Sequence, residues 1–210
     1  MIIYWDCDQK KVQWFRYTNK ERSVEIQKDL QTLKDRGVIL TSATTDGGKG
    51  VRSALEAEYP DIFQQRCTVH VERLSLSLIT KNPRLPAGHE IRKIVLLINQ
   101  IETHSQKDKW ISRFDKWYRK WKEFLKERSY SEDKKTWWYT HKKLRRVRSL
   151  IVNAISNMFY FLEDENIPKD TNGLEGRFSS FKQHYRQHRG LSEKRRKAYI
   201  AWYIKVVFNR

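Results

Sequence analysis

The sequence predicts an α/β fold whose core is interrupted in the chain by a long helical insertion. Residues 1–71 alternate short apolar runs, one helical period and turn residues. Residues 72–165 hold one glycine, Gly88, and long amphipathic stretches, whereas residues 166–210 return to a turn and two helical patterns. Strands alternating with helices are typical of a layered α/β domain, and a glycine-poor helical period is typical of packed helices. We therefore expect these three ranges to be the first part of the core, an all-α insertion and the closing helices.

The first range is expected to fold as strand, strand, helix, strand, helix, strand. The runs MIIYWDC (1–7) and KVQWFRY (11–17) flank a polar turn and predict a β-hairpin. A helical period over 18–36 ends at Gly37, as a C-terminal cap would require. The remaining expected elements are a buried strand over 38–43, a helix over 49–58 and a strand over 65–71.

The insertion is expected to contain helices over about 89–103, 106–128 and 141–163. Aromatic residues recur in the second of these at spacings of 4, 3, 4 and 3, which places them on one helical face. They are Trp110, Phe114, Trp117, Trp121 and Phe124. Such a stripe indicates core packing in preference to a platform for nucleic-acid bases.

Positive charge is concentrated after the first third of the chain. The net charge is +18, and residues 166–210 alone carry 11 Lys and Arg against 3 Asp and Glu. This range predicts helices over about 173–187, with Thr171 or Asn172 as N-cap, and 193–207, capped by Ser192. A basic surface of this kind attracts polyanions, and DNA is the first candidate. The expected phosphate contacts are Arg177, Lys182, Arg186, Arg189, Lys194, Arg195 and Arg196.

Two acidic residues are candidates for metal binding. Asp46 follows the predicted strand and precedes two glycines, at the edge where open α/β sheets bind ligands. It could equally be a turn residue, because Asp-Gly is a common turn pair. Glu175 lies in the first turn of a predicted helix, beside Gly176, a poor helix former. Its alternative role is helix capping, which suits a glutamate at that position.

Cys67 and His70 form a C-x2-H pair, which is half of a zinc site. A closed zinc site needs four ligands, and Cys7 is the only other thiol. We therefore expect no zinc, and a packed cysteine beside a hydrogen-bonded histidine. The same two cysteines make no disulfide framework. The sequence has no uncharged apolar run of about 18 residues and no cationic segment before its first apolar run, which argues against a membrane span and a signal peptide.

Six motifs occur in an order that resembles the Mutator-like DDE transposases of bacterial insertion sequences. Each is short, but their order spans nearly the whole chain. They are Asp46-Gly47-Gly48, Gln65-Arg66-Cys67-x2-His70, Lys81-x-Pro83-Arg84-x-Pro86-Ala87-Gly88, Trp138-Tyr139-Thr140-His141-x2-Leu144-Arg145, Thr171-Asn172-x-Leu174-Glu175-Gly176 and His188-Arg189-Gly190-Leu191.

The resemblance implies an RNase H-like catalytic core interrupted by the helical insertion. It implies DNA cleavage and strand transfer by two-metal chemistry, with Mg²⁺ as cofactor and Mn²⁺ as a substitute. The second acid of the triad maps onto Asp46, the third onto Glu175, and the family's C-x2-H motif onto Cys67 and His70. The implied partners are the terminal inverted repeats of the element, target DNA and further copies of the chain, in the bacterial cytoplasm at the nucleoid.

One part of the family pattern has no clear counterpart here. The first acid belongs on the first of three antiparallel strands, and only two strands fit before the first predicted helix. The expectation is therefore an N-terminally truncated copy, weak or inactive in catalysis, with Asp6 and Asp8 as the only early substitutes. Two alternatives stay open, a non-catalytic DNA-binding remnant and an RNase H-type metal-dependent nuclease.

Overall fold

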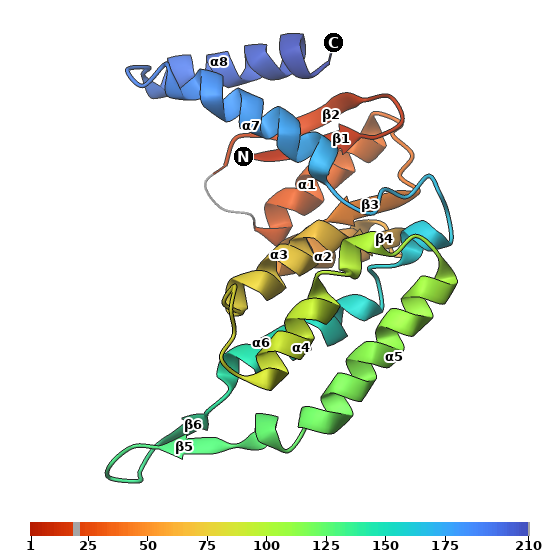
Figure 1. Cartoon of the computed structure of the whole chain (residues 1–210). Coiled ribbons are helices and arrows are strands. Elements are labelled where there is room, and N and C mark those ends of the chain that lie inside the picture. The colour runs from red at the N-terminus through yellow and green to blue at the C-terminus, as the bar shows by residue number, and fades with distance from the viewer. Residues whose placement is uncertain (19–21, 210) are drawn as a thin grey trace. The chain divides into compact units, whose positions relative to one another are not determined.

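The computed structural model describes residues 1–18 and 22–209, and the chain divides into two compact units. Unit 1 joins Met1–Gln64 to Thr171–Arg210, and unit 2 is Gln65–Asp170. The start of the helix expected over 18–36 lies partly outside the described residues. Helices and strands are mixed, as an α/β fold requires (Figure 1). Within the described ranges, no helix combines the length and apolar composition needed to cross a lipid bilayer.

The elements of unit 1 follow the predicted order over most of their length. They are β1 (Ile2–Asp6), β2 (Lys11–Arg16), α1 (Ser23–Asp35), β3 (Ser42–Thr45), α2 (Lys49–Glu58), the first half of β4 (Phe63–Arg66), α7 (Asn172–Arg186), α8 (Glu193–Tyr203) and η4 (Ile204–Phe208). The predicted hairpin is confirmed, since β1 and β2 pair antiparallel with a bulge between Tyr4 and Trp5.

The hairpin β1–β2 is apolar on both faces and separates two cores. In Figure 1 it lies between α1 and α7. Alternate side chains of a strand point to opposite faces. Ile2, Tyr4 and Trp14 pack with α1 and α2 around Ile26 and Leu30. The other face packs with α7 and α8, through Met1, Ile3, Val12, Phe15 and Tyr17. Unit 1 is therefore layered, with helices on both sides of a strand pair.

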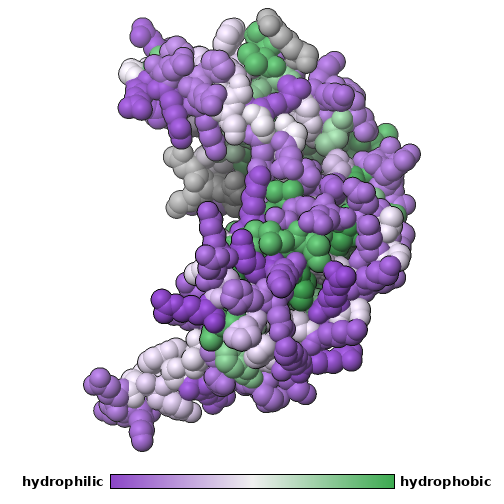
Figure 2. Space-filling view, in the orientation of Figure 1, coloured by the Kyte–Doolittle hydropathy of each residue, from purple (hydrophilic) through white to green (hydrophobic). Residues whose placement is uncertain are grey.

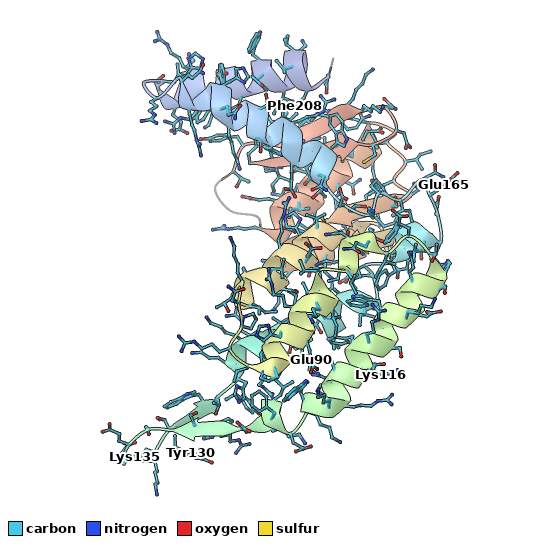
Figure 3. The ribbon with its side chains drawn as sticks, in the orientation of Figure 1. Glu90, Lys116, Tyr130, Lys135, Glu165 and Phe208 are labelled. Atoms are coloured by element: carbon cyan, nitrogen blue, oxygen red, sulfur yellow. The ribbon has the colours of Figure 1, made fainter. Side chains whose placement is uncertain are left out.

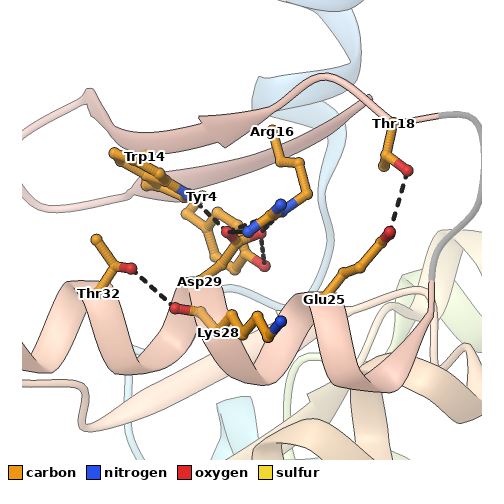
Figure 4. Close-up of polar contacts among 8 residues, drawn as sticks. All are labelled: Tyr4, Trp14, Arg16, Thr18, Glu25, Lys28, Asp29 and Thr32. Carbon is orange, nitrogen blue, oxygen red and sulfur yellow. Dashed lines mark hydrogen bonds and ion pairs between the residues drawn. The ribbon is translucent and has the colours of Figure 1, made fainter.

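A buried carboxylate joins the hairpin to α1 (Figure 4). Asp29 is fully buried and accepts hydrogen bonds from Tyr4 Oη at 3.1 Å and Trp14 Nε1 at 2.8 Å. The guanidinium of Arg16 donates to both carboxylate oxygens, with Nε at 2.9 Å from each. A buried charge is tolerated only when it is paired and hydrogen-bonded, and Asp29 is both.

The strand predicted over 38–43 is wrong in position, because β3 occupies Ser42–Thr45. Helix α1 ends in a Schellman motif, in which Gly37 adopts φ +77° and Val38 N donates to Leu33 O at 3.0 Å. The backbone N–H of Val38 is therefore used to close the end of the helix and is not available to a strand partner. The next residue, Ile39, is 88% exposed. The chain becomes extended only after this cap.

Unit 2 is built mainly from helices around one continuous core. Its elements are α3 (Thr68–Leu78), α4 (Pro86–Val95), η1 (Ile98–Gln100), α5 (His104–Trp121), η2 (Phe124–Lys126), β5 (Arg128–Tyr130), β6 (Trp137–Tyr139), α6 (Lys142–Ile155) and η3 (Tyr160–Leu162). The aromatic stripe is confirmed as core: Trp110, Phe114 and Trp117 are at most 3% exposed, and Trp121 and Phe124 pack against them. Gly88 is required in α4, since a Cβ there would lie 2.8 Å from Pro83 Cβ.

Two expectations for this part of the chain are corrected. The strand predicted over 65–71 ends at Arg66, and α3 begins at Thr68 with Cys67 as N-cap. The insertion is not all-helical, because β5 and β6 form an antiparallel hairpin between η2 and α6. Among the described residues, strands form three separate two-stranded sheets, β1–β2, β3–β4 and β5–β6.

Candidate active site and nucleic-acid interface

Asp46 lies in the connection between β3 and α2, at the surface of unit 1. Its Oδ1 accepts a hydrogen bond from Gly48 N at 2.9 Å, which closes a short Asx-type turn. Gly47 adopts φ +75° in this turn and donates its N–H to Thr45 Oγ1 at 3.1 Å. The turn role expected as the alternative is therefore present. Among the residues that the structure describes, this hydrogen bond engages Oδ1, so the exposed carboxylate is held in place at the N-terminus of α2.

Glu175 lies in the first turn of α7 and is half-buried. Its Oε1 accepts a hydrogen bond from Thr171 Oγ1 at 3.2 Å, and its N–H donates to Thr171 O at 2.9 Å. Thr171 is the N-cap residue, as predicted, but its side chain orients Glu175 and makes no capping hydrogen bond. The helix start therefore positions this carboxylate.

Gly176 has no neighbouring protein atom that explains the absence of a side chain. A Cβ at this position would meet nothing within 4 Å. A glycine inside a helix costs about 1 kcal/mol relative to alanine. The protein's own packing thus gives no reason for glycine beside Glu175, and the surface there is open to an approaching molecule.

Asp46 and Glu175 belong to the same compact unit although they are 129 positions apart in the sequence. In the sequence, unit 2 lies between β3 and α7, yet β3 and α7 both belong to unit 1. Over residues 1–18 and 22–209, however, the structure assembles no group of three or more Asp, Glu, His or Cys side chains that could hold a metal ion. The arrangement supplies two carboxylates, and the third acid is not identified among the described residues.

Asp6, the early substitute considered for the first acid, is occupied within its own hairpin. Its Oδ1 accepts from the N–H groups of Asp8 and Gln9 at 3.0 and 2.9 Å, and its Oδ2 accepts from Gln13 Nε2 at 2.9 Å. Partial burial alone would raise the pKa of Asp6, but these hydrogen bonds together outweigh it and lower the pKa. The carboxylate serves the turn between β1 and β2.

Five of the seven predicted phosphate contacts lie exposed on α7, α8 and the turn between them. They are Lys182, Arg186, Arg189, Lys194 and Arg195. Figure 2 shows that the surface over these helices is largely hydrophilic. Lys182 and Arg186 are four residues apart and share one face of α7. In the part of the chain that the structure describes, none of the five forms an ion pair with an acidic side chain. Their charge is therefore available to a ligand.

The other two predicted contacts are partly buried. Arg177 donates from Nη1 to Phe208 O at 2.9 Å, and its guanidinium lies 4.6 Å from the ring centroid of Trp5. It thereby ties α7 to β1 and to the C-terminal end of unit 1, near the position of Phe208 in Figure 3. Arg196 is half-buried on α8, and its Nε is shielded from solvent. We expect these two side chains to contribute more to stability than to ligand binding.

Cys67 and His70 lie together at the start of α3 in unit 2. Cys67 is fully buried, and its Sγ lies 3.2 Å from His70 Nδ1. This is the packed cysteine and hydrogen-bonded histidine that the sequence led us to expect. The contact links the N-cap residue to the first turn of the helix.

Sequence analysis missed one surface, the hairpin β5–β6. Its strands have three residues each, too short for a visible period, and the sequence predicts no element between the helices expected over 106–128 and 141–163. The available signal was the pair of aromatic segments, Arg128–Tyr130 and Trp137–Tyr139, on either side of a polar turn.

A family model described as "Transposase, Mutator family" matches residues 3–158. The match covers well over half of the chain, and it includes Asp46, Cys67, His70 and the hairpin β5–β6. It ends before Glu175 and the basic helices α7 and α8. A search of curated protein sequences finds no match. From the family match, the chain belongs to the Mutator family of transposases.

Proposed function

We propose that the chain carries the catalytic core of a transposase that cleaves DNA at the ends of a mobile element and joins them to target DNA. The observation that carries this proposal is the return of α7, with Glu175, to the unit that holds Asp46 in a member of this family. In this proposal unit 1 is an RNase H-like core, unit 2 is the insertion, and several copies act together on paired DNA ends.

Asp46 and Glu175 are the proposed metal ligands. Mg²⁺ prefers hard oxygen donors and is commonly held by one or two carboxylates together with substrate phosphates. The donor chemistry fits, because both side chains are carboxylates, one exposed and one half-buried. Bound divalent ions would activate the attacking oxygen and stabilise the leaving oxygen. The chain's own part is to hold the carboxylates, Asp46 through Gly48 N–H and Glu175 through Thr171.

The exposed cations of α7 and α8 are the proposed contacts to the DNA backbone. Phosphate contacts fix the position of a protein on DNA without reading its sequence. Each phosphate contact that is lost should reduce the salt dependence of binding by about one unit of slope. We expect Lys182→Ala and Arg186→Ala to show this on any duplex, while the matched variant Lys116→Ala on α5 changes the slope little.

The test of catalysis is cleavage of a duplex that bears the inverted repeats flanking the gene. It is run with Mg²⁺ or Mn²⁺, using the unaltered chain, Asp46→Asn, Glu175→Gln and Asp61→Asn as an exposed control from the same unit. Loss of a metal-holding carboxylate should lower the rate by about a hundred-fold or more. Mn²⁺ binding, followed by electron paramagnetic resonance, should weaken in the two site variants only. Equal activity in all four proteins would exclude these acids.

The same experiment separates the two alternative functions. A non-catalytic DNA-binding remnant would bind the duplex in all four forms and cleave it in none, and the absence of an assembled acid trio among the described residues is the observation that favours it. An RNase H-type nuclease would need both acids but would cleave sequences unrelated to the inverted repeats equally well.

A further inference from the structure

The hairpin β5–β6 of unit 2 carries large aromatic side chains that face solvent. Tyr130 is 56% exposed, and Trp137 and Trp138 are each 47% exposed. Tyr130 and Lys135 mark the hairpin in Figure 3, where it extends beyond the helices of unit 2. Two adjacent exposed tryptophans are a costly surface for a soluble domain, since rings of this size normally fill cores or interfaces.

The strand register places these rings on both faces of the hairpin. Tyr130 is paired with Trp137, and Ser129 is paired with Trp138. Side chains of paired residues lie on the same face, and successive residues lie on opposite faces. Trp137 and Tyr130 therefore share one face, while Trp138 lies on the other. Each face presents one indole.

The hairpin is held in shape by its own contacts. The guanidinium of Arg128 lies 4.0 Å from the ring centroid of Trp137, and Tyr139 meets the same indole edge-to-face at 5.2 Å. Arg145 of α6 lies 3.5 Å from the centroid of Tyr139, which ties the hairpin to the helical core. At the tip, Ser131 N donates to Thr136 O at 3.0 Å. The indole of Trp137 is thus presented with little conformational freedom left to lose on binding.

The surroundings of the rings are cationic. Residues 126–146 contain 8 Lys and Arg against 3 Asp and Glu. In Figure 2 the hairpin is mostly pale, the shade of intermediate hydropathy, with strongly hydrophilic atoms at its tip. This pairing of flat apolar rings with positive charge is complementary to nucleic-acid strands, which offer flat bases on an anionic backbone.

A lipid surface is the less favoured partner. The tip that would enter the bilayer carries Glu132 and Asp133, both exposed. Hydrogen bonds from Ser131 Oγ and Lys135 N lower the pKa of Asp133 and keep it charged. A fixed carboxylate at the leading edge opposes insertion into an apolar layer.

We propose that the hairpin β5–β6 binds unpaired nucleotides of DNA, with bases stacked on Trp137 and Trp138. In an intact duplex the faces of the bases are already covered by their neighbours, so exposed indoles are complementary to single-stranded or frayed ends. This inference rests on the proposed function for its DNA substrate, but it concerns a different unit and a different strand state. It assigns unit 2 a role in holding DNA whose ends have opened.

The test compares the affinity of the full chain for a 12-nucleotide single strand and for the same sequence in a closed hairpin duplex, by fluorescence anisotropy at fixed salt. Trp137→Ala and Trp138→Ala should each weaken single-strand binding by about ten-fold. Duplex affinity should change by less than about two-fold. Trp137→Phe, which keeps a stacking face, should restore most of the binding, and Trp137→Leu, which keeps only apolar bulk, should not.

Several outcomes would overturn the proposal. They are unchanged single-strand binding in both alanine variants, equal loss on both DNA forms, and full rescue by Trp137→Leu. A second measurement is sedimentation with phosphatidylglycerol vesicles. If the alanine variants at Trp137 and Trp138 lose vesicle binding but keep their affinity for single-stranded DNA, the hairpin would be assigned to a membrane. The binding assay is run in EDTA and needs no cleavage, so failure of the catalytic proposal is distinguishable from failure of this one.

Discussion

The two units of this chain bury their interiors by different means. Unit 2 has one continuous core, to which α3, α4, α5 and α6 all contribute apolar side chains. Unit 1 has two smaller clusters on opposite faces of the hairpin β1–β2, and beside one of them the buried carboxylate of Asp29 pairs with the partly exposed Arg16. Both proposed catalytic acids belong to unit 1. The part assigned to chemistry is therefore the part that holds a fully buried carboxylate, that of Asp29.

The difference shows how stability and function are divided. Packing of large apolar rings tolerates few changes in volume, and in unit 2 the buried indoles of Trp110 and Trp117 also donate to backbone carbonyls. A buried network such as Asp29 with Tyr4, Trp14 and Arg16 must be fully satisfied to persist. Substitutions in the two units should therefore reduce the free energy of unfolding by different amounts. In unit 1 the loss should depend on charge and hydrogen bonding, and in unit 2 on the volume removed.

The largest effect should come from opening the core of unit 2. Trp110 is 2% exposed, stacks on Phe114 at 6.0 Å and donates from Nε1 to Ile94 O at 2.8 Å. We expect Trp110→Ala to reduce the free energy of unfolding by about 3–5 kcal/mol, through the cavity and the lost hydrogen bond. Urea unfolding followed by circular dichroism measures it. Trp138→Ala, an exposed tryptophan of the same unit, should cost less than about 0.5 kcal/mol; equal losses would mean that Trp110 is not core.

A smaller loss is expected when the polar network of unit 1 is broken. Asp29→Asn removes the charge that faces Arg16 and should cost about 2–3 kcal/mol, below the value for a fully buried pair because the Arg16 side chain is 31% exposed. The double variant Arg16→Met/Asp29→Asn should lose less than the sum of the single losses. Strict additivity in urea unfolding would show that the two side chains do not act as a pair.

The contrast also explains what could be predicted from the sequence. The aromatic stripe of α5 is a local pattern, since spacings of 3 and 4 place rings on one face whatever the rest of the chain does. The hairpin β1–β2 was equally visible in two apolar runs around a turn. By contrast, nothing local marks Asp29, whose three partners come from two strands elsewhere in the chain.

The errors share a physical cause. Val38 and Ile39 have high strand propensity, but in the Schellman motif at the end of α1 the N–H of Val38 donates to Leu33 O. Thr68, Val69 and Val71 are β-branched and were assigned to a strand, yet they form the first turns of α3 and pack into unit 2. Intrinsic propensity is a weak prior that tertiary contacts override.

For the site, the sequence located two carboxylates and a basic surface, but not the state of each side chain. It did not distinguish Arg177, which contacts Trp5 and Phe208, from Lys182, which is exposed. That distinction depends on contacts between α7, β1 and η4, which no pattern within α7 reveals. The pairing of Asp46 with Glu175 remains a prediction.

A small pH-dependent effect is expected at Glu90, on α4 of unit 2. Partial burial alone would raise the pKa of Glu90 (labelled in Figure 3), but hydrogen bonds from Lys120 and Trp121 outweigh it and lower the pKa. A lowered pKa in the folded state means that the stabilisation is present above the unfolded pKa and is lost as pH falls through the folded one. Because the side chain is 37% exposed, we expect Glu90→Gln to cost only about 0.5–1 kcal/mol at pH 7. In urea unfolding at decreasing pH, the difference from the unaltered chain should vanish below the folded pKa; a difference that persists would assign the cost to packing.

The smallest expected change has the opposite sign and links stability to function in unit 1. Gly176 is inside α7 with open space where a side chain would stand. Gly176→Ala should therefore raise the free energy of unfolding by about 0.5–1 kcal/mol through helix propensity. If DNA or its metal ions approach the backbone beside Glu175, the same methyl group should lower the cleavage rate. Ser179→Ala, an exposed position of the same helix, should also raise helix stability, by about half as much, and leave cleavage unchanged. A Gly176→Ala variant that is more stable and equally active would show that this surface of α7 is not where the substrate comes closest.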